Sequence, residues 1–286
     1  MGNNRKRKLV IEEGTTEIQI GEYADYTQLE TVWMPDSIVN IGNQAFENCR
    51  KLKTVHLSAN LERIGHSAFR GCAIEDIDIP NGVKMIGEWS FAFNPLTKVY
   101  IPDSVNSLCA FAFWECKNLR EVRLPKYAGS KIGLGNSCFS GCKNLEKVEF
   151  SSRFYTIGSG AFDGCEKMRD VDLTEVELIK KNAFSGCTSL RCVRLDKIRI
   201  IEEFAFGHCT GLEKVEINNP ECKVDKYAFE FTKFKSAPIA ASTSNLKKPS
   251  EVTHYNNNKY DDYHWSPSDI AEYYGYDNVQ DYYDNL

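Results

Sequence analysis

The residues of this chain best suited to chemistry are its 11 cysteines and 5 histidines. Cysteine thiolates and histidine rings bind zinc, and a cysteine paired with a histidine can act as a nucleophile. Two places have a spacing that such chemistry could use. Cys138 and Cys142 are separated by three residues, and His208 and Cys209 are adjacent. The other histidines are dispersed, at positions 56, 66, 254 and 264.

A repeat along the chain gives most of the cysteines another explanation. Ten aromatic residues recur at spacings of 22 to 26 residues: Tyr23, Phe46, Phe69, Phe91, Phe113, Phe139, Phe162, Phe184, Phe206 and Phe229. Self-similarity at such a period is typical of a solenoid, in which each unit forms one coil stacked on the last. Seven cysteines share one phase of this repeat: Cys49, Cys72, Cys116, Cys142, Cys165, Cys187 and Cys209. A cysteine placed by a period most simply fills one core position per coil.

We therefore expect buried, reduced thiols and neither a metal site nor a cofactor. Asn94 and Thr232 occupy the cysteine position in other coils, which argues against a ladder of disulfides. Cys142 and Cys209 lie in the core phase, so His208 should point away from its neighbour. The chain also has no glycine-rich phosphate-binding loop and no G-x-S-x-G, H-E-x-x-H or C-x-x-C motif. The sequence thus predicts that the protein is not an enzyme.

Charge and hydropathy argue against further classes of protein. The net charge of −5 does not favour a nucleic-acid binder, which usually carries a basic stripe. No run approaches the ~18 apolar residues that cross a bilayer, so membrane insertion is not expected. The basic stretch 5–8 is followed by only three apolar residues, too few for a secretory signal. We expect a cytoplasmic protein, or a cell-surface or secreted one if a leader was removed.

Each repeat contains a short alternating segment that predicts a β-strand. In Val122–Leu124 the two apolar residues point to one side and the arginine between them to the other, and Pro125 ends the strand. Equivalent segments are centred on Val32, Val55, Ile77, Val99, Val148, Val171, Val193 and Val215. Their common phase predicts one parallel sheet of nine strands. Glycines that follow in many coils, such as Gly87 and Gly158, suit a turn with positive φ.

Successive units follow one pattern, roughly C-x-x-L-x-x-V-x-L-P-x-x-V-x-x-I-G-x-x-A-F-x-x-C, which is met nearly in full from Cys49 to Cys72 and from Cys209 to Phe229. In this they resemble the leucine-rich repeats of the BspA-like family. The resemblance implies an α/β fold: a right-handed, horseshoe-shaped leucine-rich-repeat solenoid of about ten coils of 22–26 residues. It places a parallel sheet on one face and irregular or short helical segments on the other. For some relatives it also implies surface display and adhesion to host or partner proteins.

The ends of the chain differ from the repeats. We expect an N-terminal cap over residues 1–20, the solenoid over 21–235 and a linker rich in Ala, Ser and Pro over 236–250. Residues 251–286 hold eight of the 14 tyrosines, eight acidic residues and one lysine. This acidic, tyrosine-rich segment caps the solenoid, is partly disordered, or binds a partner as a tail.

The outward face of the predicted strands is what the repeat leaves variable. Its central column reads Trp33, His56, Asp78, Tyr100, Arg123, Glu149, Asp172, Arg194 and Glu216. One interpretation is a ladder of opposite charges that keeps the sheet soluble, and the other is a ligand platform. The first half is richer in rings, which concentrate binding energy in interfaces. We predict a non-enzymatic protein-binding scaffold that uses Trp33, His56, Asp78, Tyr100 and Arg123. The alternative is a cell-surface adhesin that binds host matrix or partner-cell proteins.

Overall fold

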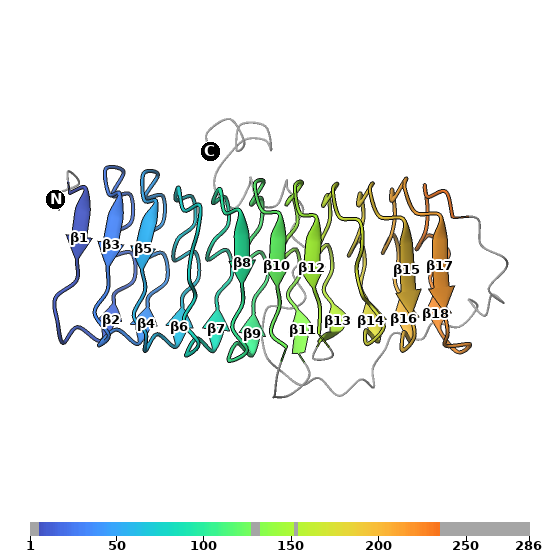
Figure 1. Cartoon of the computed structure of the whole chain (residues 1–286), viewed down its shortest axis with the longest axis horizontal. Coiled ribbons are helices and arrows are strands. Elements are labelled where there is room, and N and C mark those ends of the chain that lie inside the picture. Colours follow the sequence, from blue (N-terminus) through green and yellow to red (C-terminus); the bar gives the residue numbers. More distant parts are fainter. Residues whose placement is uncertain (1–5, 127–131, 152–153, 235–286) are drawn as a thin grey trace. The chain divides into compact units, whose positions relative to one another are not determined.

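The described coils stack along one axis in about nine turns (Figure 1). This computed structural model describes residues 6–126, 132–151 and 154–234. The chain divides into two units, Met1–Leu246 and Lys247–Leu286, and the second lies wholly outside the described residues. The predicted linker 236–250 and the acidic segment 251–286 also lie outside them.

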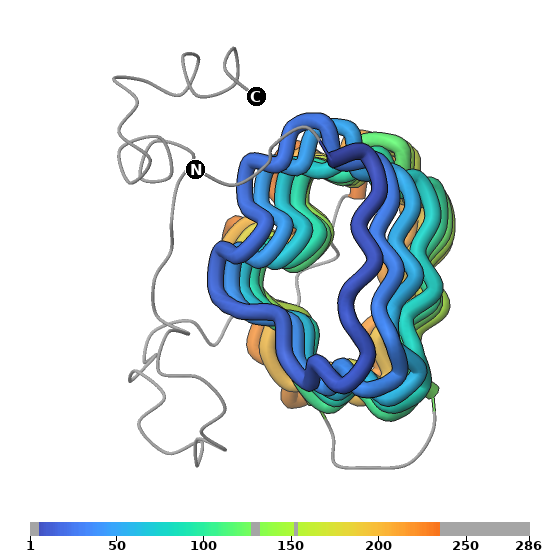
Figure 2. Tube along the Cα trace, turned by 90° about the vertical axis from the view of Figure 1, so that its left-hand side faces the viewer, coloured from blue at the N-terminus to red at the C-terminus, as the bar shows by residue number. Residues whose placement is uncertain are grey.

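Parallel strands run in two rows along the stack (Figure 1). The first row holds β1 (Lys8–Val10), β3 (Thr31–Trp33), β5 (Thr54–His56), β8 (Lys98–Tyr100), β10 (Glu121–Arg123), β12 (Lys147–Glu149), β15 (Cys192–Leu195) and β17 (Lys214–Ile217). The second row holds β2 (Glu17–Ile18), β4 (Asn40–Ile41), β6 (Arg63–Ile64), β7 (Met85–Ile86), β9 (Ser107–Leu108), β11 (Ile132–Leu134), β13 (Phe154–Ile157), β14 (Leu178–Ile179), β16 (Ile200–Ile201) and β18 (Lys223–Val224). Figure 2 looks along the stack and shows successive coils closely superimposed.

The first coil takes part in both rows. Strand β1 pairs with β3, and β2 pairs with β4, so residues of the predicted cap 1–20 continue the sheets that follow. Leu9 of β1 lies opposite Val32, and both side chains are buried.

The first row is interrupted twice, so the prediction of one nine-stranded sheet is wrong. It divides into β1-β3-β5, β12-β10-β8 and β15-β17. The missing strands are the segments 76–78 (Asp-Ile-Asp) and 170–172 (Asp-Val-Asp). Aspartate is disfavoured in strands because its side chain competes for nearby backbone donors. Asp172 shows this directly, since its Oδ1 accepts the Thr174 N–H at 3.1 Å.

The return segment of each coil is a run of tight turns held by the neighbouring coil. The N–H groups of Gln44, Phe46 and Asn48 donate to carbonyls of the next coil at 2.7–2.8 Å, while those between them donate three residues back. Gln44 and Asn48 have φ of 57° and 58°. A helix cannot have this alternation, because its N–H groups donate four residues back with φ near −60°.

The expected α/β class is accordingly not confirmed, because the described ranges contain no helix. The expected number of about ten coils is not confirmed either, since the stack has about nine turns. A horseshoe forms when helices make the return side wider than the strand side. Here backbone hydrogen bonds join the coils on both sides, and the strands stand in a nearly straight row (Figure 1).

The glycines of the repeat are required by close packing rather than by the positive φ that we expected. Gly87 and Gly158 have φ outside the left-handed region. A Cβ on Gly87 would lie 2.7 Å from the backbone carbon of Gly65, and one on Gly158 would lie 2.5 Å from the carbonyl oxygen of Leu134. Both contacts are shorter than the 3.0 Å that real Cβ atoms respect.

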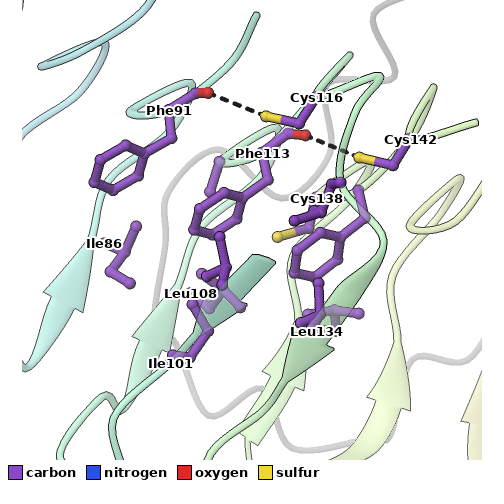
Figure 3. Packing of buried hydrophobic residues seen from close by; sticks show 14 of the residues in the cluster. Ile86, Phe91, Ile101, Leu108, Phe113, Cys116, Leu134, Cys138 and Cys142 are labelled. Carbon is purple, nitrogen blue, oxygen red and sulfur yellow. Dashed lines mark hydrogen bonds between the residues drawn. The ribbon is translucent and has the colours of Figure 1, made fainter. Parts of the chain in front are cut away.

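A column of buried phenylalanines forms the centre of every coil. From Phe46 to Phe229 the rings stack with centroids 5.2–5.5 Å apart. Figure 3 shows Phe91 and Phe113 side by side in this column. Tyr23 continues the stack at its first end, and the Phe234 ring meets Phe229 edge-on at the other. The predicted core role of the repeated aromatics is confirmed.

Candidate functional site

The structure shows where the cysteines and histidines that could have formed a chemical site lie. All eleven cysteines are free and nine of them are buried. Burial raises the pKa of the Cys142 thiol well above its ordinary value, which keeps it protonated and unreactive. His208 is exposed and stacks on Phe231 at 4.6 Å, whereas Cys209 is buried, so the adjacent pair points apart. No cluster of three metal-binding side chains occurs in the described ranges.

The cysteine position of the repeat selects a hydrogen-bond donor, which sequence reasoning missed. Each of its seven thiols donates to the carbonyl of the column aromatic in the preceding coil, at 3.0–3.3 Å (Figure 3). Asn94 keeps this bond, because its amide nitrogen donates to the Phe69 carbonyl at 2.7 Å. Thr232 donates instead to Phe229 of its own coil. The signal was present, since Cys, Asn and Thr all carry a donor.

Asn94 also supports the first interruption of the strand row. The stretch between Cys72 and the segment 76–78 is one residue shorter than its equivalent in the preceding coil. There, the Leu52 N–H donates to the carbonyl three residues back at 2.8 Å. The equivalent N–H, that of Ile74, donates instead to Asn94 Oδ1 at 3.1 Å.

Trp33 and His56 form a continuous aromatic surface on the strand face, by which we mean the outward residues of the first row. They are register partners on β3 and β5, and their rings stack with centroids 3.5 Å apart at 19°. Both are exposed, and Trp33 keeps 50% of its surface accessible within the stack. Rings fixed on rigid strands lose little conformational freedom when a partner binds.

Val10 extends this surface by one strand. It pairs with Trp33 across β1 and β3 and is 72% exposed. We call Val10, Trp33 and His56 the aromatic shelf. Sequence reasoning missed Val10 because it placed residues 1–20 in a cap. The signal was that Leu9 stands 23 residues before Val32, which is one period of the repeat.

The other predicted residues lie further along the same face. Tyr100 and Arg123 are register partners on β8 and β10, and both are exposed. Asp78 is exposed in the interruption between β5 and β8. The structure thus brings the five predicted residues onto one face as two pairs, Trp33 with His56 and Tyr100 with Arg123, with Asp78 on the coil between them.

Most charged residues are paired on the C-terminal part of the strand face, from β12 to β17, with Asp170 and Asp172 as exceptions. Lys147 contacts Glu149 at 2.6 Å and Glu121 at 3.5 Å. Arg194 contacts Asp196 at 2.9 Å, and Lys214 contacts Glu216 at 2.5 Å. The charge-ladder interpretation therefore describes this part of the face.

Charged residues of the N-terminal part, from β1 to β10, are arranged differently. Asp78, Lys98 and Arg123 form no ion pair within the residues that the structure describes. They lie beside the exposed rings of His56 and Tyr100. This part of the face thus combines open aromatic surface with charges that no neighbour neutralises.

Ion pairing changes the acidity of the C-terminal part. Hydrogen bonds from Lys147 and Lys126 lower the pKa of Glu149 to about 2. The hydrogen bond from Lys214 lowers the pKa of Glu216 in the same way. Because these side chains are exposed and screened by solvent, each pair contributes little to stability.

A second aromatic group, on the return segments, is buried. Arg70 pairs with Glu47 at 2.9 Å, and its guanidinium lies 5.4 Å from the Phe93 ring centroid and 5.9 Å from that of Trp89. Trp89 in turn stacks on Phe111 at 4.3 Å. Arg70, Trp89 and Phe111 are all buried, so this group packs coils together and offers no open surface.

The repeat is matched by a known family of proteins. The family model described as BspA type Leucine rich repeat region (6 copies) matches residues 16–133 and 132–258. The chain belongs to the BspA-type leucine-rich repeat family. No curated protein matches the sequence.

Solved structures of leucine-rich repeat proteins are similar to this BspA-type chain. One from T. pallidum is 31% identical, with a TM-score of 0.53, over 58% of this chain and 79% of that one. Another from Bacteroides ovatus is 22% identical, with a TM-score of 0.51, over 78% of this chain and 72% of that one. The family model confirms the resemblance to the BspA-like family.

BspA-type repeats have a fold that is generally used for protein–protein binding. Within the described ranges, no helix has the length and apolar character needed to cross a bilayer.

Proposed function

We propose that this BspA-type protein is a non-enzymatic scaffold that binds a protein partner on the N-terminal part of its strand face. The contact residues are Trp33, His56, Asp78, Tyr100 and Arg123. The observation that carries the proposal is the exposed Trp33–His56 stack, which lies beside charges that are not neutralised within the described chain.

The residue types support a protein partner. Trp, Tyr and Arg are the residues most enriched among those that dominate interface energetics. Trp33 and Tyr100 are half exposed on separate strands, and Arg123 is exposed beside Tyr100. The coils that carry them are joined past the interruption at 76–78 by backbone hydrogen bonds of the return segments and of the second row, so the contact residues are held in fixed positions before binding.

The lack of an ion pair at Asp78 and Arg123 within the described residues also favours binding. A partner that contacts Glu149 or Glu216 must compete with the lysines already bound to them. Asp78 and Arg123 carry no such competitor in the described residues. Their desolvation is the only electrostatic cost, and a complementary charge on the partner offsets it.

The experiment is affinity capture with the full chain immobilised and lysate of its own organism as the source. We expect Trp33→Ala with Tyr100→Ala to remove the captured protein. Arg194→Ala with Glu216→Ala, on the C-terminal part of the same face, is the matched control and should leave capture unchanged. Capture that survives the first double substitution contradicts the proposal. Far-UV circular dichroism of each variant checks that the solenoid remains folded.

A further inference from the structure

The N-terminal part of the strand face also indicates the chemistry of its partner. We infer that the bound partner segment carries an apolar or aromatic side chain for the aromatic shelf and, next to it, an arginine for Asp76 and Asp78. This inference rests on the proposed function and specifies its partner.

The aromatic shelf fits an apolar anchor. Val10, Trp33 and His56 stand in one column on β1, β3 and β5, which at ~4.8 Å per strand spans roughly 10 Å. Val10 is 72% and Trp33 50% exposed. Such a surface matches one large side chain lying across three strands, and its burial is favourable because apolar area leaves water.

Acidic side chains lie directly after the shelf. Asp76 and Asp78 occupy the outward positions of the next coil, and Glu75 precedes them. Among the residues that the structure describes, Asp76 accepts a hydrogen bond only from the Thr97 hydroxyl, at 3.3 Å, and Glu75 Oε1 is 3.9 Å from Lys53 Nζ. Asp76 and Asp78 thus form no ion pair in the described residues, and Glu75 has only its long contact to Lys53.

The surrounding cations do not neutralise this acidic pair. Lys98 is exposed on the following strand, β8, and makes no ion pair in the described residues. Outward residues two apart in an extended segment are roughly 7 Å from each other. A guanidinium between them can bond to carboxylate oxygens in a fixed planar geometry.

An arginine fits this place better than a lysine. The acidic coil is flanked by rings on both sides, His56 before it and Tyr100 after it. A guanidinium stacks on aromatic faces while it bonds to carboxylates, whereas an ammonium is a compact, strongly hydrated charge. A partner with an apolar residue and a neighbouring arginine therefore satisfies the rings and the carboxylates together.

The second interrupted coil provides a built-in control. Asp170 and Asp172 have the same spacing and exposure, but the N–H and hydroxyl of Thr174 both donate to Asp172, and Lys147 stands opposite Asp170 in a backbone β-bridge. Their neighbours on the face are charged residues and Cys192 rather than rings. An acidic pair alone is thus present twice, and only the first lies beside an aromatic shelf.

The test is selection of phage-displayed random dodecapeptides on the immobilised full chain. We expect peptides that combine an aromatic or large apolar residue with arginine. Their affinity should fall at least about tenfold with Asp76→Asn and Asp78→Asn, and should stay within about twofold with Asp170→Asn and Asp172→Asn. Binding should also weaken as salt rises, because the arginine contact is ionic. Asn is close to Asp in size, and circular dichroism checks the fold.

Two negative results have different meanings. Selected peptides that require Trp33 and His56 but lack basic residues overturn this inference and leave the proposed function standing. Selected peptides that bind equally well to the chain with Trp33→Ala and His56→Ala overturn both. A further variant, Asp78→Lys, should shift the selection from arginine toward aspartate and glutamate, and an unchanged selection also contradicts the inference.

Discussion

The two parts of the strand face share one interior but use their outward residues differently. Beneath both parts, phenylalanine rings stack at similar spacing, and cysteine thiols donate to the carbonyl of the equivalent phenylalanine in the preceding coil. On the surface, the C-terminal part pairs most of its charges, while the N-terminal part combines exposed rings with Asp78, Lys98 and Arg123, which form no ion pair in the described residues. The repeat thus determines the packing of every coil and leaves the outward positions free to diverge.

The uniform interior predicts equal losses when a ring is removed under either part. Phe91 lies beneath the N-terminal part and Phe184 beneath the C-terminal part, and both rings are fully buried. The two test variants are Phe91→Ala and Phe184→Ala. Each substitution should lower the free energy of unfolding by about 3–5 kcal/mol. Urea unfolding followed by circular dichroism measures both. Values that differ by more than about 2 kcal/mol would show that the coils are not packed alike.

Asn94 is the interior feature that distinguishes the N-terminal part. Asn94→Leu leaves the Ile74 N–H and a Phe69 carbonyl bond unsatisfied, so we expect a loss of about 2–4 kcal/mol. Asn94→Cys restores the thiol donor of the other coils but not the acceptor for Ile74, and should cost less. Hydrogen exchange at the Ile74 amide should accelerate in both variants. An unchanged exchange rate would contradict the role given to Asn94.

Substitution of the closely packed glycines Gly87 and Gly158 by alanine should lower the stability of the two parts by similar amounts. In Gly87→Ala and Gly158→Ala the new Cβ meets backbone at 2.7 and 2.5 Å, which should cost about 1–3 kcal/mol each. Gly133→Ala is the control, because its nearest neighbour would be 3.8 Å away and its φ is ordinary. Equal urea midpoints for Gly158→Ala and Gly133→Ala would mean that the coils separate easily to admit a methyl group.

The smallest effect concerns pH and separates the two parts directly. The folded pKa of Glu149 is about 2, below the ordinary value near 4.3, so its ion pairs stabilise the protein above pH ~4.3 and lose that effect as the pH falls toward 2. Glu149→Gln should therefore reduce the fall in urea midpoint between pH 5 and pH 2.5. Asp78→Asn removes a charge without an ion pair and should leave the midpoint at pH 7 unchanged.

Much of the fold is predictable because the period is regular. The strand phase of Val122, the buried ring of Phe113 and the core position of Cys116 all follow from counting residues along one repeat. The breaks at 76–78 and 170–172 did not follow, since apolar residues keep the pattern there and only the flanking aspartates oppose a strand. The turns of the return segment depend on hydrogen bonds between coils, which no single repeat contains.

The regular period also predicts which residues point outward from the strands. It does not predict how the outward residues of the two parts differ in their contacts. Alternation places Trp33 and Glu216 in one column, but it cannot tell that a tryptophan stacks on a histidine while the glutamate binds Lys214. Those outcomes depend on side-chain conformations on neighbouring strands. Val10 was overlooked because an expected cap hid one more period of the repeat.

Because most of the thiols are buried, this cysteine-rich chain has a single exposed cysteine that a thiol reagent can label. Burial raises the pKa of Cys116 to about 12, so at pH 7 roughly one molecule in 10⁵ carries the reactive thiolate there. Partial burial raises the pKa of Cys222 to about 11. Cys192 is the one exposed cysteine, on β15 of the C-terminal part. A maleimide dye added to the folded protein should label mainly this position, far along the stack from the aromatic shelf, and so leave the proposed contact surface untouched.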